Sequence, residues 1–237
     1  MRNRFAATIA VATLAVFGAS CGEANPTGGV LFTGSVNDAS VRLINALTAA
    51  QGLDFLVDER VAASGTQFGG ASPYIGVSAS THRLQAEGST SGTTLVDFTR
   101  DLTTGGSFSM IPAPGLNQFG ALFIADDPSP AVGQVKVRGI NVSAATGPVA
   151  VYLTSATDDI SSATPTIPAL VFGAVSPYVL VPPGNYRIRL TPVGNPSEIL
   201  ADAGSVVLGA GSVRTLLVTD APGGGLPTTL SVIVDNN

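Results

Sequence analysis

The sequence predicts an all-β protein made of two tandem immunoglobulin-like or Greek-key β-sandwiches, after a cleaved signal peptide and a short flexible tether. A seven-residue motif occurs twice, 104 positions apart. Short β-rich runs alternate with turn residues at the spacing that is typical of sandwiches. After the N-terminal region, no run of ten or more residues has convincing helical spacing. Together these observations indicate two copies of one β domain.

The repeated motif reads Phe-Gly-Gly-Ala-Ser-Pro-Tyr at 68–74 and Phe-Gly-Ala-Val-Ser-Pro-Tyr at 172–178. The openings of the two copies, Val41-Arg42 and Val137-Arg138, are only 96 positions apart. The second copy therefore has eight extra residues before its motif. They fit the Ser-, Thr-, Pro- and Ala-rich stretch 158–168, which is typical of an enlarged loop.

The repeat predicts a first sandwich over residues 39–126, a linker over 127–134 and a second sandwich over 135–237. Closing strands are expected at 122–124 and 232–234, which match at an offset of 110. The strands of the first sandwich are expected near 40–46, 53–58, 74–78, 81–87, 93–99, 106–111 and 119–125. Those of the second are expected near 135–142, 149–154, 177–181, 185–191, 199–202, 205–208, 212–219 and 228–235.

Charged residues are scarce in this chain. They make up 11% of it, against about 25% in an average soluble domain, while the hydrophobic content of 45% is enough for two packed cores. The formal net charge is −5 and Lys136 is the only lysine. Because binding to phosphate depends on clustered lysine and arginine, the composition argues against a nucleic-acid partner.

The first twenty residues have the layout of a signal peptide. Arg2 and Arg4 precede an uncharged apolar run over 5–17, which is short for a membrane span. Gly18-Ala19-Ser20 then precedes Cys21, the only cysteine. This segment resembles a bacterial lipoprotein signal, and the resemblance implies that Cys21 is lipidated and becomes the mature N-terminus. The alternative is ordinary secretion, with Cys21 an incidental residue near the cleavage site.

A lipidated Cys21 implies a membrane anchor. Two or three acyl chains would hold the protein firmly, since each buried methylene adds about 0.8 kcal/mol of membrane affinity. Gly22 follows the cysteine, and in Gram-negative lipoproteins this resembles the default that leads to the outer membrane. Residues 21–38 are expected to be the tether. Without a second cysteine, neither sandwich can hold an internal disulfide.

The repeated motif has two readings. In the structural reading, Gly69 and Gly173 allow a backbone that a Cβ would obstruct, and Tyr74 and Tyr178 place a ring in the core and tie a loop through the hydroxyl. In the functional reading, the paired aromatic residues form a platform for a sugar or a peptide. The motif residues singled out are Phe68, Gly69, Tyr74, Phe172, Gly173 and Tyr178.

These residues resemble the domain-of-unknown-function family 4397, which occurs in bacterial envelope and exported proteins. The features that carry the resemblance are Val41-Arg42 with Asn45, Asp54 in the second strand, and the repeated motif. In the second copy, Val149 is the best match to Asp54. The resemblance implies a β-sandwich and an envelope location, and it implies no activity.

Residues suited to catalysis or metal binding are few. His82, the only histidine, aligns with the strand residue Tyr186, and no Gly-x-Ser-x-Gly elbow accompanies it. With a single histidine and a lipidated cysteine, a zinc site of the usual ligands cannot form. The acidic pairs Asp126-Asp127 and Asp158-Asp159 are weak calcium candidates, since they lack the alternating spacing of a known loop. We therefore expect no catalytic residues and no cofactor.

The sequence thus favours a non-enzymatic, lipid-anchored envelope protein that acts as a structural or binding module. The alternative is a carbohydrate- or peptide-binding module of an envelope surface complex. An envelope hydrolase ranks third, since it would need acidic residues gathered from both sandwiches. The expected partners are the membrane, through Cys21, and an envelope protein or a glycan.

Overall fold

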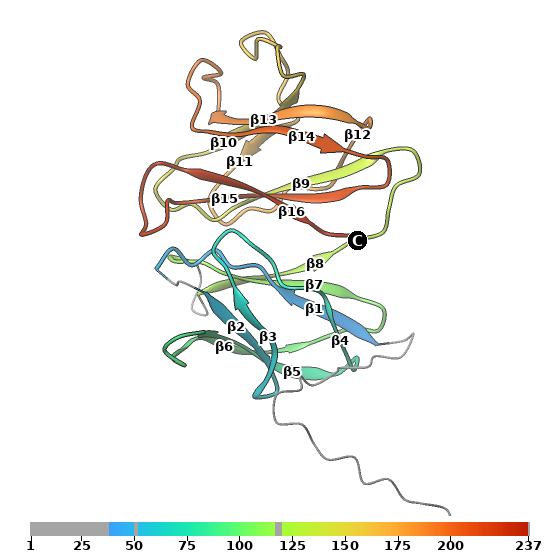
Figure 1. Ribbon diagram of the computed structural model, residues 1–237, viewed down its shortest axis with the longest axis vertical. Coiled ribbons are helices and arrows are strands. Elements are labelled where there is room, and N and C mark those ends of the chain that lie inside the picture. Colours follow the sequence, from blue (N-terminus) through green and yellow to red (C-terminus); the bar gives the residue numbers. More distant parts are fainter. Residues whose placement is uncertain (1–37, 50–51, 117–119, 237) are drawn as a thin grey trace, which may run out of the picture.

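The computed structural model describes residues 38–49, 52–116 and 120–236, which form sixteen β-strands and no helix (Figure 1). The described part therefore also contains no helix that could cross a membrane. The first eight strands are β1 (Ala39–Leu43), β2 (Leu53–Val57), β3 (Arg60–Thr66), β4 (Ile75–Val77), β5 (Thr81–Gly88), β6 (Thr94–Asp101), β7 (Ser107–Pro112) and β8 (Ala121–Asp126). The others are β9 (Val135–Asn141), β10 (Val149–Thr154), β11 (Ile167–Leu170), β12 (Val179–Val181), β13 (Gly184–Pro192), β14 (Ala201–Leu208), β15 (Val213–Thr219) and β16 (Thr229–Val234).

Each half of the chain forms one sandwich-like unit of two four-stranded sheets. The first unit has an inner sheet, β4-β1-β7-β8, and an outer sheet, β3-β2-β5-β6. The second unit repeats this with an inner sheet, β12-β9-β15-β16, and an outer sheet, β11-β10-β13-β14. The two inner sheets face each other, so the molecule is a stack of four sheets (Figure 1). The prediction of an all-β protein with two sandwiches is confirmed.

Three apolar clusters hold the stack together. One fills the first unit around Phe55 and Leu84, and a second fills the second unit around Val151 and Ile188. A third lies between the inner sheets; its buried members are Ile44, Ala46, Ile111, Ala113, Leu116, Ile140, Val142, Leu217 and Ile233. The inner sheets are therefore covered on both faces, which explains why every residue of β9 is buried.

The closing strands match at an offset of 109, so the predicted offset of 110 is wrong. Ile124 pairs with Ser109, and Ile233 pairs with Thr215. Because β8 and β16 have apolar residues toward both the core and the other unit, hydrophobicity does not fix their register. The corrected register makes Asp126 equivalent to Asp235.

Two strands lie where none was predicted. β3 is rich in Ala, Ser and Gly, and β11 contains Pro168, so both have weak β-propensity and form only as hairpin partners of β2 and β10. β14 is one strand, where two short ones were expected. The extra residues of the second copy lie between β10 and β11, where the first unit has only the two-residue turn Asp58-Glu59.

Gly69 of the motif meets the second unit directly. Its φ is +73°, and a Cβ placed there would lie 2.6 Å from Oγ of Ser231 on β16. Gly92 has a similar φ of +63° but open space around it. A side chain added at Gly92 therefore measures the cost of the left-handed backbone alone, which is about 1–2 kcal/mol.

We expect Gly69→Ala to lower the free energy of unfolding by more than Gly92→Ala does, because only Gly69 gains a clash as well as backbone strain. In the double variant Gly69→Ala/Ser231→Ala, the excess should disappear. Urea unfolding of the three variants measures this. Equal losses for the two single variants would show that Ser231 does not press on Gly69.

Candidate functional site

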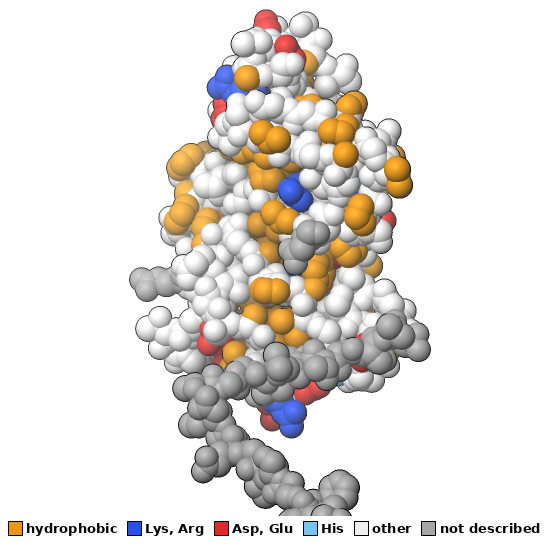
Figure 2. Space-filling model, turned by 45° about the vertical axis from the view of Figure 1, so that its right-hand side comes forward, with side chains coloured by type: hydrophobic (Ala, Val, Ile, Leu, Met, Phe, Trp, Pro, Cys, Tyr) orange, Lys and Arg blue, Asp and Glu red, His pale blue; other side chains and the backbone are white. Residues whose placement is uncertain are grey.

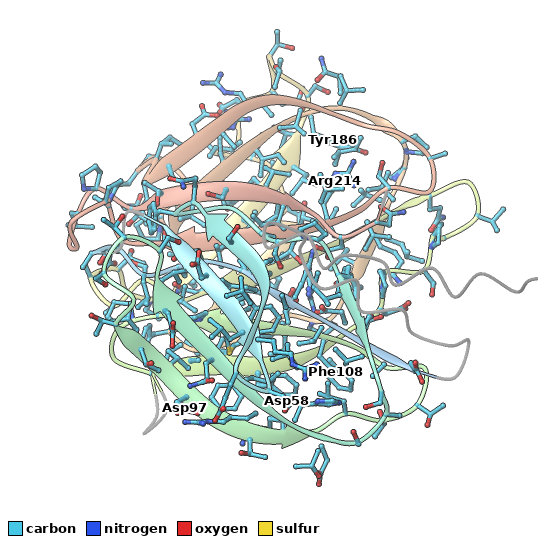
Figure 3. All side chains as sticks on the ribbon, turned by 60° about the horizontal axis from the view of Figure 1, so that its bottom comes forward. Asp58, Asp97, Phe108, Tyr186 and Arg214 are labelled. Atoms are coloured by element: carbon cyan, nitrogen blue, oxygen red, sulfur yellow. The ribbon has the colours of Figure 1, made fainter. Side chains whose placement is uncertain are left out.

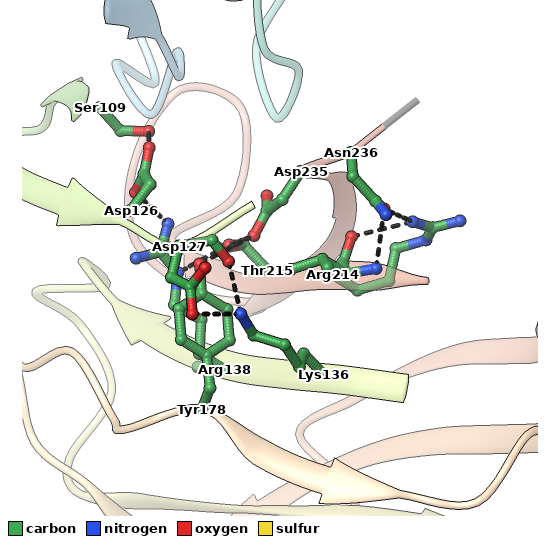
Figure 4. A network of polar contacts seen from close by, with 12 residues as sticks. Ser109, Asp126, Asp127, Lys136, Arg138, Tyr178, Arg214, Thr215, Asp235 and Asn236 are labelled. Carbon is green, nitrogen blue, oxygen red and sulfur yellow. Dashed lines mark hydrogen bonds and ion pairs between the residues drawn. The ribbon is translucent and has the colours of Figure 1, made fainter. Parts of the chain in front are cut away.

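Four buried charged side chains join the two units in a reciprocal pattern, and Figure 4 shows three of them, Asp126, Arg138 and Asp235. Nη2 of Arg42 in the first unit donates to Oδ1 of Asp235 in the second at 2.7 Å. Nη2 of Arg138 in the second unit donates to Oδ1 of Asp126 in the first. The arginine side chains are 1% and 2% exposed and both carboxylates are fully buried. Two positive and two negative charges therefore balance inside the interface.

The same pseudo-twofold pattern extends to the neighbours of these charges. Nε of Arg42 donates to Ser109, and Nε of Arg138 donates to Thr215, at the paired position of the other unit. Each arginine also donates from Nη1 to a backbone carbonyl of the opposite closing strand; these carbonyls belong to Val234 and Ala125. Charged groups are tolerated in the interior only when hydrogen bonds such as these satisfy their polar atoms. The network therefore favours one relative position of the two units.

The motif tyrosines cover the arginines. The guanidinium of Arg42 lies 4.4 Å from the ring centre of Tyr74, and that of Arg138 lies 4.9 Å from the ring centre of Tyr178. The hydroxyl of Tyr74 donates to Asp126 at 2.7 Å. Burial raises the pKa of both tyrosines above its ordinary value, which keeps the hydroxyls protonated as donors. The rings thus stack on the arginine guanidinium groups at the interface, whereas the sequence predicted that they lie in a core.

Three of the other motif residues, Gly69, Phe172 and Gly173, also lie where the units meet. Gly69 faces Ser231, as described above, and a Cβ on Gly173 would lie 3.6 Å from Leu116 of the first unit. Phe172 is 37% exposed, and its ring end would lie 3.6 Å from a Cβ on Gly115. Phe68 is half-buried. The two copies of the motif therefore position each unit against the other.

The acidic calcium candidates have other partners. Asp126 accepts hydrogen bonds from Arg138, Ser109 and Tyr74. Asp127 pairs with Lys136, and this hydrogen bond holds the pKa of its carboxyl below the ordinary value although burial opposes it. No group of three His, Cys, Asp or Glu side chains suited to a metal occurs among the residues that the structure describes. Cys21, the predicted lipidation site, lies outside the described residues.

His82 belongs to a polar cluster that the sequence did not reveal. It lies on β5, and Nδ1 is 2.7 Å from Oδ2 of Asp58. Figure 3 places Asp58 and Asp97 on the first unit, far from Tyr186 and Arg214 of the second. Burial raises the pKa of Asp58, but hydrogen bonds with His82 and the Arg83 amide outweigh this and hold the pKa below its ordinary value.

This cluster has the residue types of a serine-hydrolase triad but differs in its hydrogen bonding. Nε2 of His82 is 3.1 Å from Oγ of Ser78 and of Ser80, and 2.9 Å from the Ser78 carbonyl oxygen. A carbonyl oxygen can only accept, so Nε2 is the donor in its contact with the Ser78 carbonyl, whereas the base of a triad accepts a proton from the serine. The geometry therefore suits a structural role, in which the His82 side chain links the β2–β3 turn to the segment before β5.

A groove of about 520 Å³ lies beside the network on the first unit's side. One wall is the motif segment 69–74 and the other is the end of β16 with Asp235. Figure 2 shows hydrophobic side chains, with few charged ones, over the middle of one face, where the two units meet. A second cleft, of about 470 Å³, is more apolar and lies by Leu47, Leu95 and Pro114.

The fold and the network define a tandem β-sandwich protein whose two units share one buried, charge-paired interface. Residues 39–152 match the family model described as "Domain of unknown function (DUF4397)", which supports the predicted family resemblance. The match covers the first unit and runs into β10 of the second. Comparison with curated proteins gives no match.

Two solved structures are similar over most of this chain. One is CBMbc, the family CBM26 module of Amy13K from Eubacterium rectale, in complex with maltoheptaose; it is 11% identical, with a TM-score of 0.27, over 82% of this chain and 95% of that one. The other is a family 41 carbohydrate-binding module from streptococcal virulence factors, described for alpha-glucan recognition; it is 12% identical, with a TM-score of 0.28, over 81% and 96%. TM-scores this low carry no argument about ligands.

Proposed function

We propose that this protein is a lipid-anchored component of the bacterial cell envelope that works as a structural or binding module and not as a catalyst. The observation that carries the proposal is the reciprocal network of Arg42, Asp126, Arg138 and Asp235. It joins two small sandwiches into one body without a disulfide. A body of this kind can present a fixed surface at the end of a tether.

The anchor is part of the same proposal. Cys21 follows a charged and then apolar N-terminal segment, and Gly22 favours the outer membrane if the host has two membranes. Diacylglyceryl transfer to the cysteine sulfur, followed by cleavage before Cys21, would attach the mature protein to the membrane through its acyl chains.

The test of the anchor is the mass and the location of the mature protein. In the native host, we expect an N-terminal peptide that begins at an acylated Cys21, and recovery of the protein in the membrane fraction. The variant Cys21→Ser should appear in the soluble envelope fraction, while the matched variant Ser20→Ala should stay with the membrane. An unmodified mature N-terminus in the soluble fraction would overturn the proposal.

The second candidate is a carbohydrate- or peptide-binding module of a surface complex. The groove between segment 69–74 and β16 favours it, because it is a concave site on the body that the network holds together. Its walls come from both units, so a ligand there would depend on the interface.

A further inference from the structure

We propose that the groove binds an extended, uncharged peptide segment, which pairs through its backbone with the free edge of β16. This inference rests on the proposed function as a binding module and names the ligand class. Three observations support it: the direction of the β16 backbone groups, the small residues of the opposite wall, and the path of the chain after the closing strand.

β16 is the last strand of the inner sheet and pairs on one side only, with β15. The Asp235 amide donates to the Val213 carbonyl, so in this antiparallel ladder Ile233 and Ser231 also turn their backbone groups toward β15. Val232 and Val234 therefore turn theirs outward. The hydrogen bond from Arg42 to the Val234 carbonyl confirms this direction.

At this edge, the outward backbone groups of Val232 are the ones that a ligand could pair with. No hydrogen bond from the described residues reaches its backbone N–H or C=O on the outward side. Val232 to Asp235 line the groove, so the outward edge of this segment borders it. A donor and an acceptor on one residue match the backbone of an added strand, which is how exposed sheet edges bind peptides.

The opposite wall has small residues at its Gly69 end. Gly69, Gly70 and Ala71 have little or no side chain, and they are held in place by backbone bonds to the first inner sheet, including the Ile44–Ala71 bridge. One ring face of Tyr74 is taken by Arg42, so the groove does not offer that face to a sugar. The charged groups at its floor, Arg42 and Asp235, neutralise each other.

The chain that follows the closing strand takes different paths beside the two motif tyrosines. There the chain's own segment 127–129 lies near Tyr178, and Lys136 binds the carbonyls of Asp127 and Ser129. In the first unit, Ser40 replaces Lys136 and bonds to Ser107. Asn236, which follows Asp235, turns back to bond Gly211 and Val213. The described chain after Asp235 thus takes another path than segment 127–129 does after Asp126, and the groove borders Tyr74.

The experiment uses the two-unit protein and a display library of linear seven-residue peptides. We expect selected peptides to bind and to slow hydrogen exchange at the Val232 amide, measured by NMR. Val232→Pro removes the outward N–H without removing a ladder bond, so it should weaken binding at least tenfold. The control Val61→Pro changes the same kind of outward residue on edge strand β3, and should leave binding within twofold.

A second variant covers the case in which Val232→Pro does not fold. Val234 is 52% exposed and lines the groove, so Val234→Trp should obstruct it and lower peptide binding to a similar extent. Selection that yields no peptide would overturn this inference and leave the membrane anchor standing. It would also be overturned if bound peptides left Val232 exchange unchanged, or if only maltoheptaose bound. Loss of the anchor with retained peptide binding would instead overturn the envelope proposal alone.

Discussion

Asp235→Ala is expected to lower the free energy of unfolding by about 3–5 kcal/mol, because it leaves a buried arginine without its charge partner. Asp235 is fully buried and binds Arg42 at 2.7 Å and Thr215 at 2.7 Å. Its removal leaves the interface with two positive charges against one negative charge. Equilibrium unfolding in urea, followed by circular dichroism, measures the loss.

Two comparisons test whether the loss of stability in Asp235→Ala comes from the burial and the charge pairing of this residue. Arg83→Ala removes ion pairs with Glu59 and Asp97, but Arg83 is 43% exposed and water screens both pairs, so we expect a much smaller loss than for Asp235→Ala. The double variant Arg42→Met/Asp235→Leu removes both charges and should be more stable than Asp235→Ala alone. A loss for Asp235→Ala no larger than that for Arg83→Ala would mean that the network does not hold the units together.

Ile140→Ala is the second change with a large expected effect, a loss of about 2–5 kcal/mol. Ile140 lies on β9 in the cluster between the inner sheets and is fully buried. Since this cluster takes members from both units, the cavity weakens contacts on both sides. Hydrogen exchange followed by mass spectrometry should therefore speed up in β7 of the first unit as well as in β9.

Leu190→Ala is the matched control for Ile140→Ala. Leu190 is also fully buried, but it belongs to the core of the second unit alone. A similar global loss is expected, with faster exchange confined to the second unit at low denaturant. If Ile140→Ala likewise left the first unit unchanged, the two units would be thermodynamically independent.

The sequence allowed the strand content to be predicted because alternation is strong where one face of a strand meets a core. β13 is an example: Ile188 and Leu190 are fully buried in the core cluster, while Arg187 points to the outer face and pairs with Asp202. β3 and β11 were missed because their small residues and Pro168 carry no such pattern. They are strands because neighbouring strands supply the hydrogen bonds.

The site was predicted only in part. The motif residues Gly69 and Tyr74 were singled out from the repeat, but their contacts are with charged and polar groups near the other unit. Asp126 was weighed as a calcium ligand, and Asp235 was not singled out at all. The one-residue error in the offset of the closing strands hid their equivalence. The doubled Val-Arg opening was the available signal, since a buried arginine needs a partner.

The sequence by itself determined the composition of the protein, its repeat and its all-β character, because these follow from local patterns of apolar and turn residues. It also carries the N-terminal features on which the proposed anchor rests. Only the tertiary structure decided that Arg42 pairs with Asp235 and Arg138 with Asp126, across more than a hundred residues in the first case. The reason is physical: charge pairing depends on which residues the packing of the inner sheets brings within hydrogen-bond distance, and spacing along the chain does not encode that.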